Sequence, residues 1–581
     1  MKLSSLNKKI FFLSILIAYT PALYSEETID IWNKENLNKK KSSTKIENIL
    51  TEKKKSIDIN AQPPKEIEIN SNNLFASTKS IYGILEPSEN NLTLEMWENS
   101  EGTRVKDTIN RINKIKLSSY AEELFVNTLF TISKLPGQNI TEEEFINYKI
   151  DWLIHNKKDE LISIFLNKNK NFPNKGKIIK YLVDKDIAKA NLKEACSKNT
   201  LINSDVKNSY LDQFKIICLI NEDKQNEAQL VFDLLREQKL SNEFFDNKIN
   251  YLLGVKTKED KKINDTNLLN FYLSSITISD FNYIPNKKTD KKIWQYLAAA
   301  DLINISNFEN QDRIKELEIA ANKNNLAKSY ILEVYKNINF NFNDLLNVDE
   351  IYLELEPINS RALVYQKILL SDNIETKLKY LFLLNDLFKK DNLANVFKEY
   401  LSQELKAINV EKIPEEYQTL VANNIIFEKK DKLGKIKYSD KSYHTSKVMK
   451  YYVEKNFPRI KLEKELKNLQ KKIKKNKKYV ISLRDVILLE SLENDNFSLP
   501  KEVNYEKIVK NNLPPIELLN LVKNDEIGLL LLRIVELIGE DELLDLDSQT
   551  VYFINHLFIK AGLTNFRNKI LITVLPDRTE I

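Results

Sequence analysis

Two cysteines, Cys196 and Cys218, are the only thiols in this 581-residue chain, and they lie 22 positions apart. In an oxidising compartment such a pair can form a structural disulfide. Both lie near the C-terminal ends of predicted helices, so a simple antiparallel hairpin would hold their Cα atoms roughly 15–20 Å apart, whereas a disulfide needs about 7 Å or less. The connection 197–205 could span about 30 Å and run back along the helix. A structural disulfide and a pair of buried free thiols are both compatible with this spacing, and the lack of Cys-x-x-Cys argues against a redox-active pair.

The histidines do not form a recognisable active site or metal site. His155, His444 and His556 are far apart in the sequence, and none lies at metal-ligand spacing from a cysteine. The stretch 439–444 contains hydroxyl, carboxylate and imidazole groups, but catalytic triads are assembled in space and rarely from adjacent residues. We therefore expect no metal and no cofactor.

Glu490-Ser491 resembles the Glu-Ser dipeptide of soluble lytic transglycosylases, exported enzymes on a helical superhelix that cleave peptidoglycan with one catalytic glutamate. The Gly-rich, Gln-containing segment that should follow is missing, and Glu493-Asn494-Asp495 stands in its place. Gly176-Lys177 and Gly434-Lys435 lack the upstream glycine of a phosphate-binding loop. An envelope enzyme acting on peptidoglycan is therefore only the alternative function.

A lysine-rich stretch, 461–478, combines an apolar seam with a basic face. Apolar residues recur at intervals of four, three and four, as in a heptad pattern; they are Leu462, Leu466, Leu469 and Ile473. The candidate basic face consists of Lys467, Lys471, Lys474, Lys475 and Lys478. It could bind an acidic partner or an anionic lipid surface, and a solvated helix face in a lysine-rich chain is the alternative.

The composition favours a helical, globular protein. Only 9 glycines are present, which argues against Gly-rich nucleotide-binding folds and against β-sandwiches with tight turns. Apolar residues make up 42% of the chain and charged residues 29%, as in folded proteins. The 88 basic and 83 acidic residues nearly balance, with a net charge of +5, so no nucleic-acid partner is expected.

The N-terminus has the pattern of a secretory signal peptide, residues 1–25. Lys2, Lys8 and Lys9 precede an apolar run that is too short for a membrane span. Residues with short side chains, typical of a cleavage site, follow the run. An uncleaved anchor or a buried helix is the other interpretation. Residues 26–75 are polar and weakly periodic, typical of a flexible linker. Ile527 to Leu532 is apolar, but Arg533 and Glu536 follow, so we expect a core helix there and no membrane span in the mature chain. Together with the signal peptide, this predicts a periplasmic protein.

From about residue 76 the chain reads as paired amphipathic helices. Tyr210, Phe214 and Ile217 share one face, a polar turn follows, and Ala228 and Phe232 begin the next face. The same pattern recurs at 145–165, with Asp159 as a predicted N-cap, and at 378–401. Because such helices cannot bury their apolar faces alone, we predict an all-α fold, an α-solenoid of stacked antiparallel hairpins.

The small-then-large pair Ala228-x3-Phe232, in the second helix of its unit, resembles the packing of tetratricopeptide-like repeats. The spacing between units is irregular and the Trp-Leu-Gly signature is absent, so the resemblance is to a divergent helical repeat. The segments 94–97, 196–218 and 539–562 also resemble an uncharacterised family of exported helical proteins in Gram-negative bacteria. That resemblance implies no chemistry.

We therefore expect a helical-repeat domain at 76–415 and a C-terminal helical domain at 416–581. In the latter, 432–438 forms a loop or strand pair, Asp547-Ser548 begins a helix, Gly562 ends it, and the tail 577–581 is frayed. The function expected from the sequence is a periplasmic helical-repeat scaffold that binds an unknown protein or envelope partner. The sequence does not indicate an oligomeric state.

Overall fold

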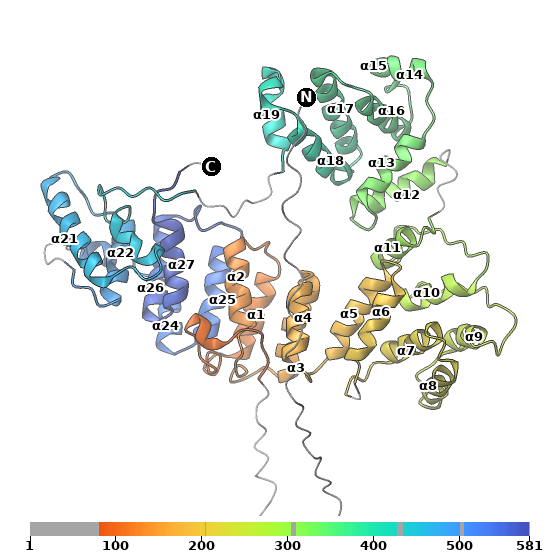
Figure 1. Cartoon of the computed structure of the whole chain (residues 1–581), viewed down its shortest axis with the longest axis horizontal. Helices are drawn as coiled ribbons and strands as arrows, with labels where there is room; N and C mark the ends of the chain where they lie inside the picture. Colours follow the sequence, from red (N-terminus) through yellow and green to blue (C-terminus); the bar gives the residue numbers. More distant parts are fainter. Residues whose placement is uncertain (1–80, 204, 304–309, 427–433, 500–504, 580–581) are drawn as a thin grey trace, which may run out of the picture. The chain divides into compact units, whose positions relative to one another are not determined.

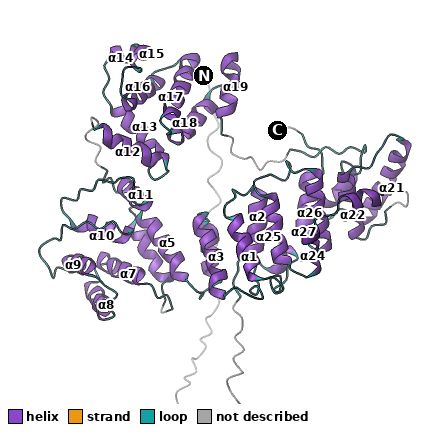
Figure 2. Ribbon diagram, turned by 180° about the vertical axis from the view of Figure 1, so that it is seen from behind, coloured by secondary structure: helices purple, strands orange, loops and turns teal. Residues whose placement is uncertain are grey.

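The computed structural model of the chain describes residues 81–203, 205–303, 310–426, 434–499 and 505–579. These residues contain 27 α-helices, and their only β-structure is three isolated bridges (Figure 2). The all-α prediction is confirmed, whereas the stacking of hairpins into a solenoid stays a prediction. The predicted signal peptide and linker lie outside the described residues. No helix in the described part of the chain has the length and apolar character needed to cross a membrane.

Four helices come first: α1 (Gly102–Ile112), α2 (Ser119–Leu129), α3 (Glu142–His155) and α4 (Asp159–Lys168). A capping box between Thr141 and Glu144 begins α3, because each side chain accepts a hydrogen bond from the other residue's backbone N–H. The N-cap prediction for Asp159 is wrong by one position, since Asp159 is the first helical residue and Lys158 precedes it. There the carboxylate accepts hydrogen bonds from Tyr181 at 3.2 Å and Lys185 at 2.6 Å.

The middle of the chain is a succession of helices, several of them joined by short turns. Their bounds are α5 (Lys175–Ile187), α6 (Leu192–Ser197), α7 (Ser209–Asn221), α8 (Gln225–Glu237), α9 (Glu243–Leu252), α10 (Leu268–Thr277), α11 (Lys291–Ala299), α12 (Gln311–Asn322), α13 (Lys328–Asn337), α14 (Phe342–Leu346), α15 (Val348–Ile351), α16 (Pro357–Leu369), α17 (Ile374–Lys390), α18 (Ala394–Ala407) and α19 (Glu415–Asn424). The predicted pair Ala228 and Phe232 is buried on α8. On α18, Val396, Phe397 and Leu401 are buried as their spacing predicts.

The C-terminal helices are α20 (Lys450–Val453), α21 (Arg459–Lys475), α22 (Leu483–Asn494), α23 (Glu506–Asn511), α24 (Ile516–Lys523), α25 (Ile527–Ile538), α26 (Ser548–Lys560) and α27 (Thr564–Val574). Asp547 caps α26 by accepting hydrogen bonds from the N–H groups of Gln549 and Thr550. Gly562 lies just beyond the end of α26 with a φ of +71°, the left-handed conformation that favours glycine at this position. Both helix-end predictions are confirmed.

The C-terminal tail is paired over its described residues. The N–H of Lys437 donates to the carbonyl of Asp577 at 2.8 Å, and the N–H of Thr579 donates to the carbonyl of Lys435 at 2.9 Å. Fraying of the tail was therefore a wrong expectation for residues 577–579. Hydrogen bonds around the isolated antiparallel bridge between Ile436 and Arg578 explain the difference. The predicted loop or strand pair at 432–438 is thus bridged to the tail at Ile436.

The buried apolar residues form two clusters. The first, which we call the terminal core, contains residues between Ile84 and Ile178 together with residues between Tyr443 and Leu575. Helices α1 and α2 both pack against α25, and they lie beside it in both views (Figures 1 and 2). The two ends of the described chain thus share one core, which includes residues on both sides of the predicted boundary at 415–416.

The second cluster, the middle core, contains residues between Ile179 and Val421. Its most extensive helix contacts join consecutive helices, namely α7 with α8 and α16 with α17. Helix α5 belongs to both clusters, because Ile178 lies in the terminal core and Ile179 in the middle core. A single helix thus carries apolar packing from one cluster to the other.

Gly528 on α25 shows how closely the ends of the chain meet. A Cβ atom at this position would lie 2.4 Å from the indole ring of Trp97, which is fully buried. The backbone N–H of Gly528 donates to the carbonyl of Met96 at 2.8 Å. Only glycine leaves room for this approach of helix and indole.

Candidate functional site

A groove of about 1090 Å³ is lined by helices that lie far apart in the sequence. Its wall is built from the turn between α3 and α4, the C-terminal half of α5, helix α11, the turn into α13, and one face of α18. The volume lies slightly above the roughly 300–1,000 Å³ typical of small-molecule pockets. The groove is therefore large enough to hold a segment of polypeptide.

Charged residues of the groove are predominantly basic. Six lysines and two carboxylates line it: Lys157, Lys185, Lys189, Lys291, Lys292, Lys328, Asp159 and Glu399. Three of the lysines are paired with carboxylates. Lys185 contacts Asp159 at 2.6 Å, Lys292 contacts the buried Asp184 at 2.7 Å, and Lys328 contacts Glu399 at 2.7 Å.

The other three lysines, Lys157, Lys189 and Lys291, form no ion pair with any residue that the structure describes. They come from three separate elements: the α3–α4 turn, the turn after α5, and the first residue of α11. Burial and the nearby positive charge of Lys157 together lower the pKa of Lys291. Like charges held this close favour the binding of an anion, which would relieve their repulsion.

The rest of the groove wall is largely apolar. Ala188, Leu326, Leu332 and Val396 are buried beneath it. Three half-buried tyrosines, Tyr181, Tyr330 and Tyr400, add aromatic surface with polar tips. Such a lining, apolar with a few convergent charges, is typical of binding sites.

Sequence reasoning did not find this groove. Its three unpaired lysines lie in two turns and at one helix start, spread over more than a hundred residues of a lysine-rich chain. Lys157 adopts a left-handed backbone conformation, with a φ of +51°, in the turn between α3 and α4. That conformation cannot be read from the residue type, so no single segment indicates the site.

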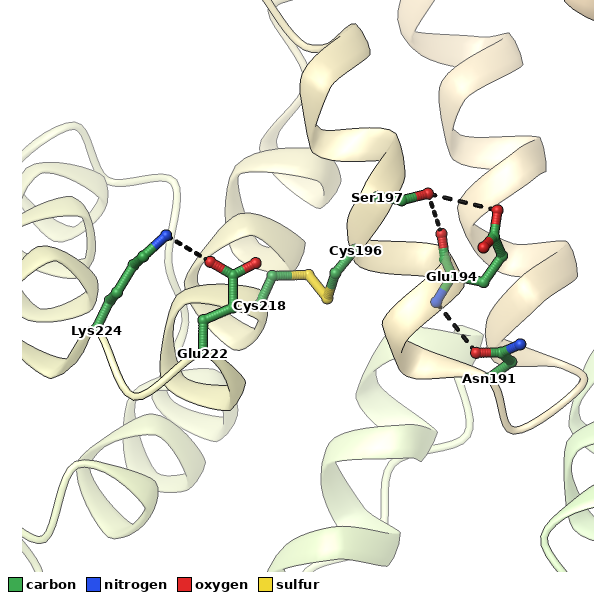
Figure 3. The surroundings of a disulfide bond; sticks show 7 residues. All are labelled: Asn191, Glu194, Cys196, Ser197, Cys218, Glu222 and Lys224. Atoms are coloured by element: carbon green, nitrogen blue, oxygen red, sulfur yellow. Dashed lines mark hydrogen bonds and ion pairs between the residues drawn. A yellow bond between two sulfur atoms is a disulfide. The ribbon is translucent and has the colours of Figure 1, made fainter. Parts of the chain in front are cut away.

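The two cysteines are brought together in the structure as a disulfide, with their Cα atoms 5.6 Å apart (Figure 3). Cys196 lies at the end of α6 and Cys218 near the end of α7. The 15–20 Å separation of a simple antiparallel hairpin therefore does not apply. Around the bridge, Asn191 caps α6 through the N–H of Glu194, and Lys224 pairs with Glu222. No described residue adds chemistry beyond a structural bridge.

The predicted basic face lies on α21 and just beyond it. Leu462, Leu466 and Leu469 are buried, as the apolar seam predicts. The five lysines Lys467, Lys471, Lys474, Lys475 and Lys478 are all exposed. The same helix holds Lys472, which pairs with Asp440 at 2.5 Å. This basic face is exposed to solvent and does not line the groove. Binding of a partner to it stays a prediction.

His444 is placed against a carboxylate that the sequence did not link to it. Its Nδ1 lies 2.8 Å from Oδ1 of Asp485, and its backbone N–H donates to the same oxygen at 3.1 Å. The other carboxylate oxygen, Oδ2, accepts hydrogen bonds from Tyr479 and from Ser482. Burial raises the pKa of Asp485, but these hydrogen bonds outweigh it and hold that pKa well below its usual range.

This Asp485 cluster joins the 439–446 loop to the start of α22, where Ser482 and Asp485 form a capping box. The Ser482-x-x-Asp485 spacing could have predicted the cap from the sequence. The contact with His444, 41 residues away, has no local signal. The hydrogen bonds to Asp485 hold the loop against the start of α22.

Glu490 lies on α22 with a side chain that is 14% exposed. The Tyr552 hydroxyl donates to it at 3.1 Å, and Nδ1 of His556 lies 3.4 Å away. Glu490 does not line the groove described above. The remaining histidine, His155, is the exposed last residue of α3. Among the described residues no three His, Cys, Asp or Glu side chains form a metal-binding group.

Comparison of the chain with protein-family models, with curated proteins and with solved structures finds no match. The tetratricopeptide-like resemblance and the resemblance to an exported family therefore stay predictions. What the structure supports is the coarser statement that many helices pack against one another in an all-helical fold.

Proposed function

We propose that this chain is an exported helical-repeat protein that binds a segment of another protein in the groove between α5, α11, α13 and α18. The observation that carries the proposal is the groove itself, which is large, mainly apolar, and lined by six lysines. Helical arrays present such concave surfaces because each helix pair contributes side chains to one common face. The mixture of buried apolar surface with a few charges favours recognition of a polypeptide.

Site-specific photo-crosslinking tests the proposal. A photoreactive amino acid replaces Gln403, an exposed residue on α18 that lines the groove. The matched control replaces Leu230, which is 63% exposed on α8 and lies outside the groove lining. We expect covalent adducts with a partner protein from position 403 and none from position 230.

Equal adducts at both positions would contradict groove binding. The absence of adducts at position 403 in cells that contain the partner would contradict it as well. Mass spectrometry of the adduct identifies the bound segment. That segment then provides the ligand for quantitative measurements with purified protein.

Export is a separate part of the proposal and has its own test. It is supported by residues 1–25, in which basic residues are followed by an apolar run and then by residues with short side chains. A fusion of residues 1–30 to a reporter that is active only outside the cytoplasm should be active, and the mature protein should begin near Glu26. Full-length chain retained in the cytoplasm would show that the compartment is wrong, without affecting the groove.

A further inference from the structure

The charges of the groove are divided unequally along its wall. On one side, the α3–α4 turn, the end of α5 and the start of α11 present Lys157, Lys189 and Lys291, none of which pairs with a described carboxylate. On the other side, Lys328 of α13 is neutralised by Glu399 at 2.7 Å and also donates to Asn395 at 3.0 Å. The groove thus has a cationic side and a side that is close to neutral.

The neutral side also carries apolar and aromatic residues. Leu326 and Val396 are buried there, and Tyr330 and Tyr400 are half-buried. Tyr400 is stacked edge-on against Tyr365, with ring centroids 5.7 Å apart, so its ring is held in place. A ligand that fills this groove well must carry anionic groups at one end and apolar side chains at the other.

We infer that the groove binds an acidic peptide segment whose carboxylates contact Lys157, Lys189 and Lys291 and whose apolar side chains pack between α13 and α18. This inference rests on the proposed function and names the chemistry of the partner. The three unpaired lysines come from three separate elements, whereas their neighbours Lys185 and Lys292 are already paired with Asp159 and Asp184. Charge complementarity of this kind determines the specificity and the association rate of a complex.

A peptide fits these observations better than a membrane or a nucleic acid. The three lysines line a hollow of about 1090 Å³, and a bilayer surface cannot enter a hollow. Single-stranded nucleic acid is bound by stacking bases on exposed aromatic faces, whereas the tyrosines here are half-buried and one is covered by another ring. Lipid and nucleic acid are therefore outcomes of the test and not the proposal.

The test measures binding of a fluorescent glutamate-rich peptide that ends in leucine and tryptophan, using fluorescence anisotropy and the full chain. A peptide with glutamine in place of every glutamate is the ligand control. We expect the acidic peptide to bind, the glutamine peptide to bind at least about 10-fold more weakly, and the affinity to fall as salt is added.

The protein variants separate the site from the overall charge. The variant Lys157→Gln, Lys189→Gln, Lys291→Gln should weaken binding of the acidic peptide about 10-fold or more, since three ion pairs are lost. The control variant Lys215→Gln, Lys239→Gln, Lys258→Gln removes the same charge from three exposed positions outside the groove and outside the basic face of α21, and should bind normally. Arginine at the three groove positions keeps the charge and should restore binding, which excludes a folding defect.

Equal weakening in both glutamine variants would overturn the inference, because binding would then follow net charge alone. Tighter binding of an oligonucleotide or of anionic vesicles, lost on substitution of the same three groove lysines, would also overturn it. If position 403 crosslinks to a partner segment that is not acidic, this inference fails and the proposed function stands. If the acidic peptide binds at the three lysines but no partner crosslinks at position 403, the proposed function fails instead.

Discussion

The terminal core and the middle core are both helical, but they are built from contacts of different range. In the terminal core, α1 and α2 pack against α25, more than four hundred residues later in the chain. In the middle core, the most extensive packing joins consecutive helices such as α16 and α17. Long-range contacts form only when the whole chain between them is arranged, whereas contacts between neighbours can form one pair at a time.

Each core buries a charged side chain whose surroundings can be tested by substitution. Arg361 on α16 donates to both oxygens of Glu318 on α12, at 2.7–3.2 Å, and both side chains are almost fully buried. The terminal core buries Lys149 with no carboxylate partner among the described residues, and its Nζ donates to the backbone carbonyl of Tyr82 at 2.8 Å. We therefore expect the two cores to respond separately to substitution and differently to pH.

The largest effect should come from Arg361→Met. Without its partner, Glu318 would be left as a buried carboxylate whose pKa burial already raises. Removing one partner of a buried ion pair costs about 3–5 kcal/mol of folding free energy. Hydrogen exchange should accelerate in α12, α13 and α16 and stay unchanged in α25.

The double variant Glu318→Leu, Arg361→Met is the control for this effect. No fully buried charge is left without a partner, because Asp391, the other carboxylate that Arg361 contacts, is partly exposed to solvent. The double variant should therefore recover much of the lost stability. If exchange in α25 accelerates as much as exchange in α16, the two cores unfold as one unit and the comparison between them fails.

Lys149→Met tests the terminal core through pH. Burial lowers the pKa of Lys149 to about 7 from its ordinary value of 10.5. Between these two values the unfolded chain binds more protons than the folded chain, so this group makes stability rise with pH, by about 3 kcal/mol from pH 7 to 10. The methionine variant should lack that rise and be relatively more stable at pH 7.

Urea unfolding of both proteins at several pH values measures the difference. The difference between them isolates Lys149 from the other groups that titrate in the same range. A wild type and a variant with parallel pH profiles would show that Lys149 reaches water in the folded protein.

Replacing both cysteines with serine should weaken the middle core alone. The disulfide closes a loop of 22 residues, for which chain-entropy estimates give about 3 kcal/mol. Hydrogen exchange should accelerate in α6 and α7, while binding in the groove and protection of α25 stay unchanged. Thiol labelling of denatured, unreduced wild-type protein should find no free thiol, and two reactive thiols per chain would show that the pair is reduced.

The smallest effect is expected from Gly528→Ala in the terminal core. The new methyl group would lie 2.4 Å from the Trp97 ring, and overpacking of this kind costs about 1–3 kcal/mol. Exchange should accelerate in α1, α2 and α25. Adding Trp97→Phe should restore part of the loss by making room, and two simply additive losses would show that the residues are not in tight contact.

Several elements of the fold could be predicted from the sequence. The burial of Val396, Phe397 and Leu401 follows from i, i+3, i+4 periodicity, which depends only on nearby residues. Asp547 and Gly562 act at the ends of α26 because their conformational preferences are local as well. The apolar seam of α21 was predicted for the same reason. Asp159 was misplaced by one position because the choice between N-cap and first helical residue depends on its bonds to α5.

The candidate site was not predictable in the same way. Lys157, Lys189 and Lys291 meet only because α3, α5 and α11 are packed together, and many other lysines in the chain occupy similar turns. His444 and Asp485 are likewise joined by packing and not by spacing. These pairings depend on which apolar faces meet, and helix faces of similar composition are interchangeable at the level of sequence pattern.

The sequence by itself therefore determined the helical fold class, several helix ends and several buried faces, because helix formation is governed by residues three and four positions apart. Only the tertiary structure decided that α25 closes on α1 and α2, that Arg361 meets Glu318, and that three unpaired lysines line one groove. The physical reason is that the burial of apolar surface is non-directional. It drives helices together, and the detailed fit of side chains such as Trp97 over Gly528 selects the partners.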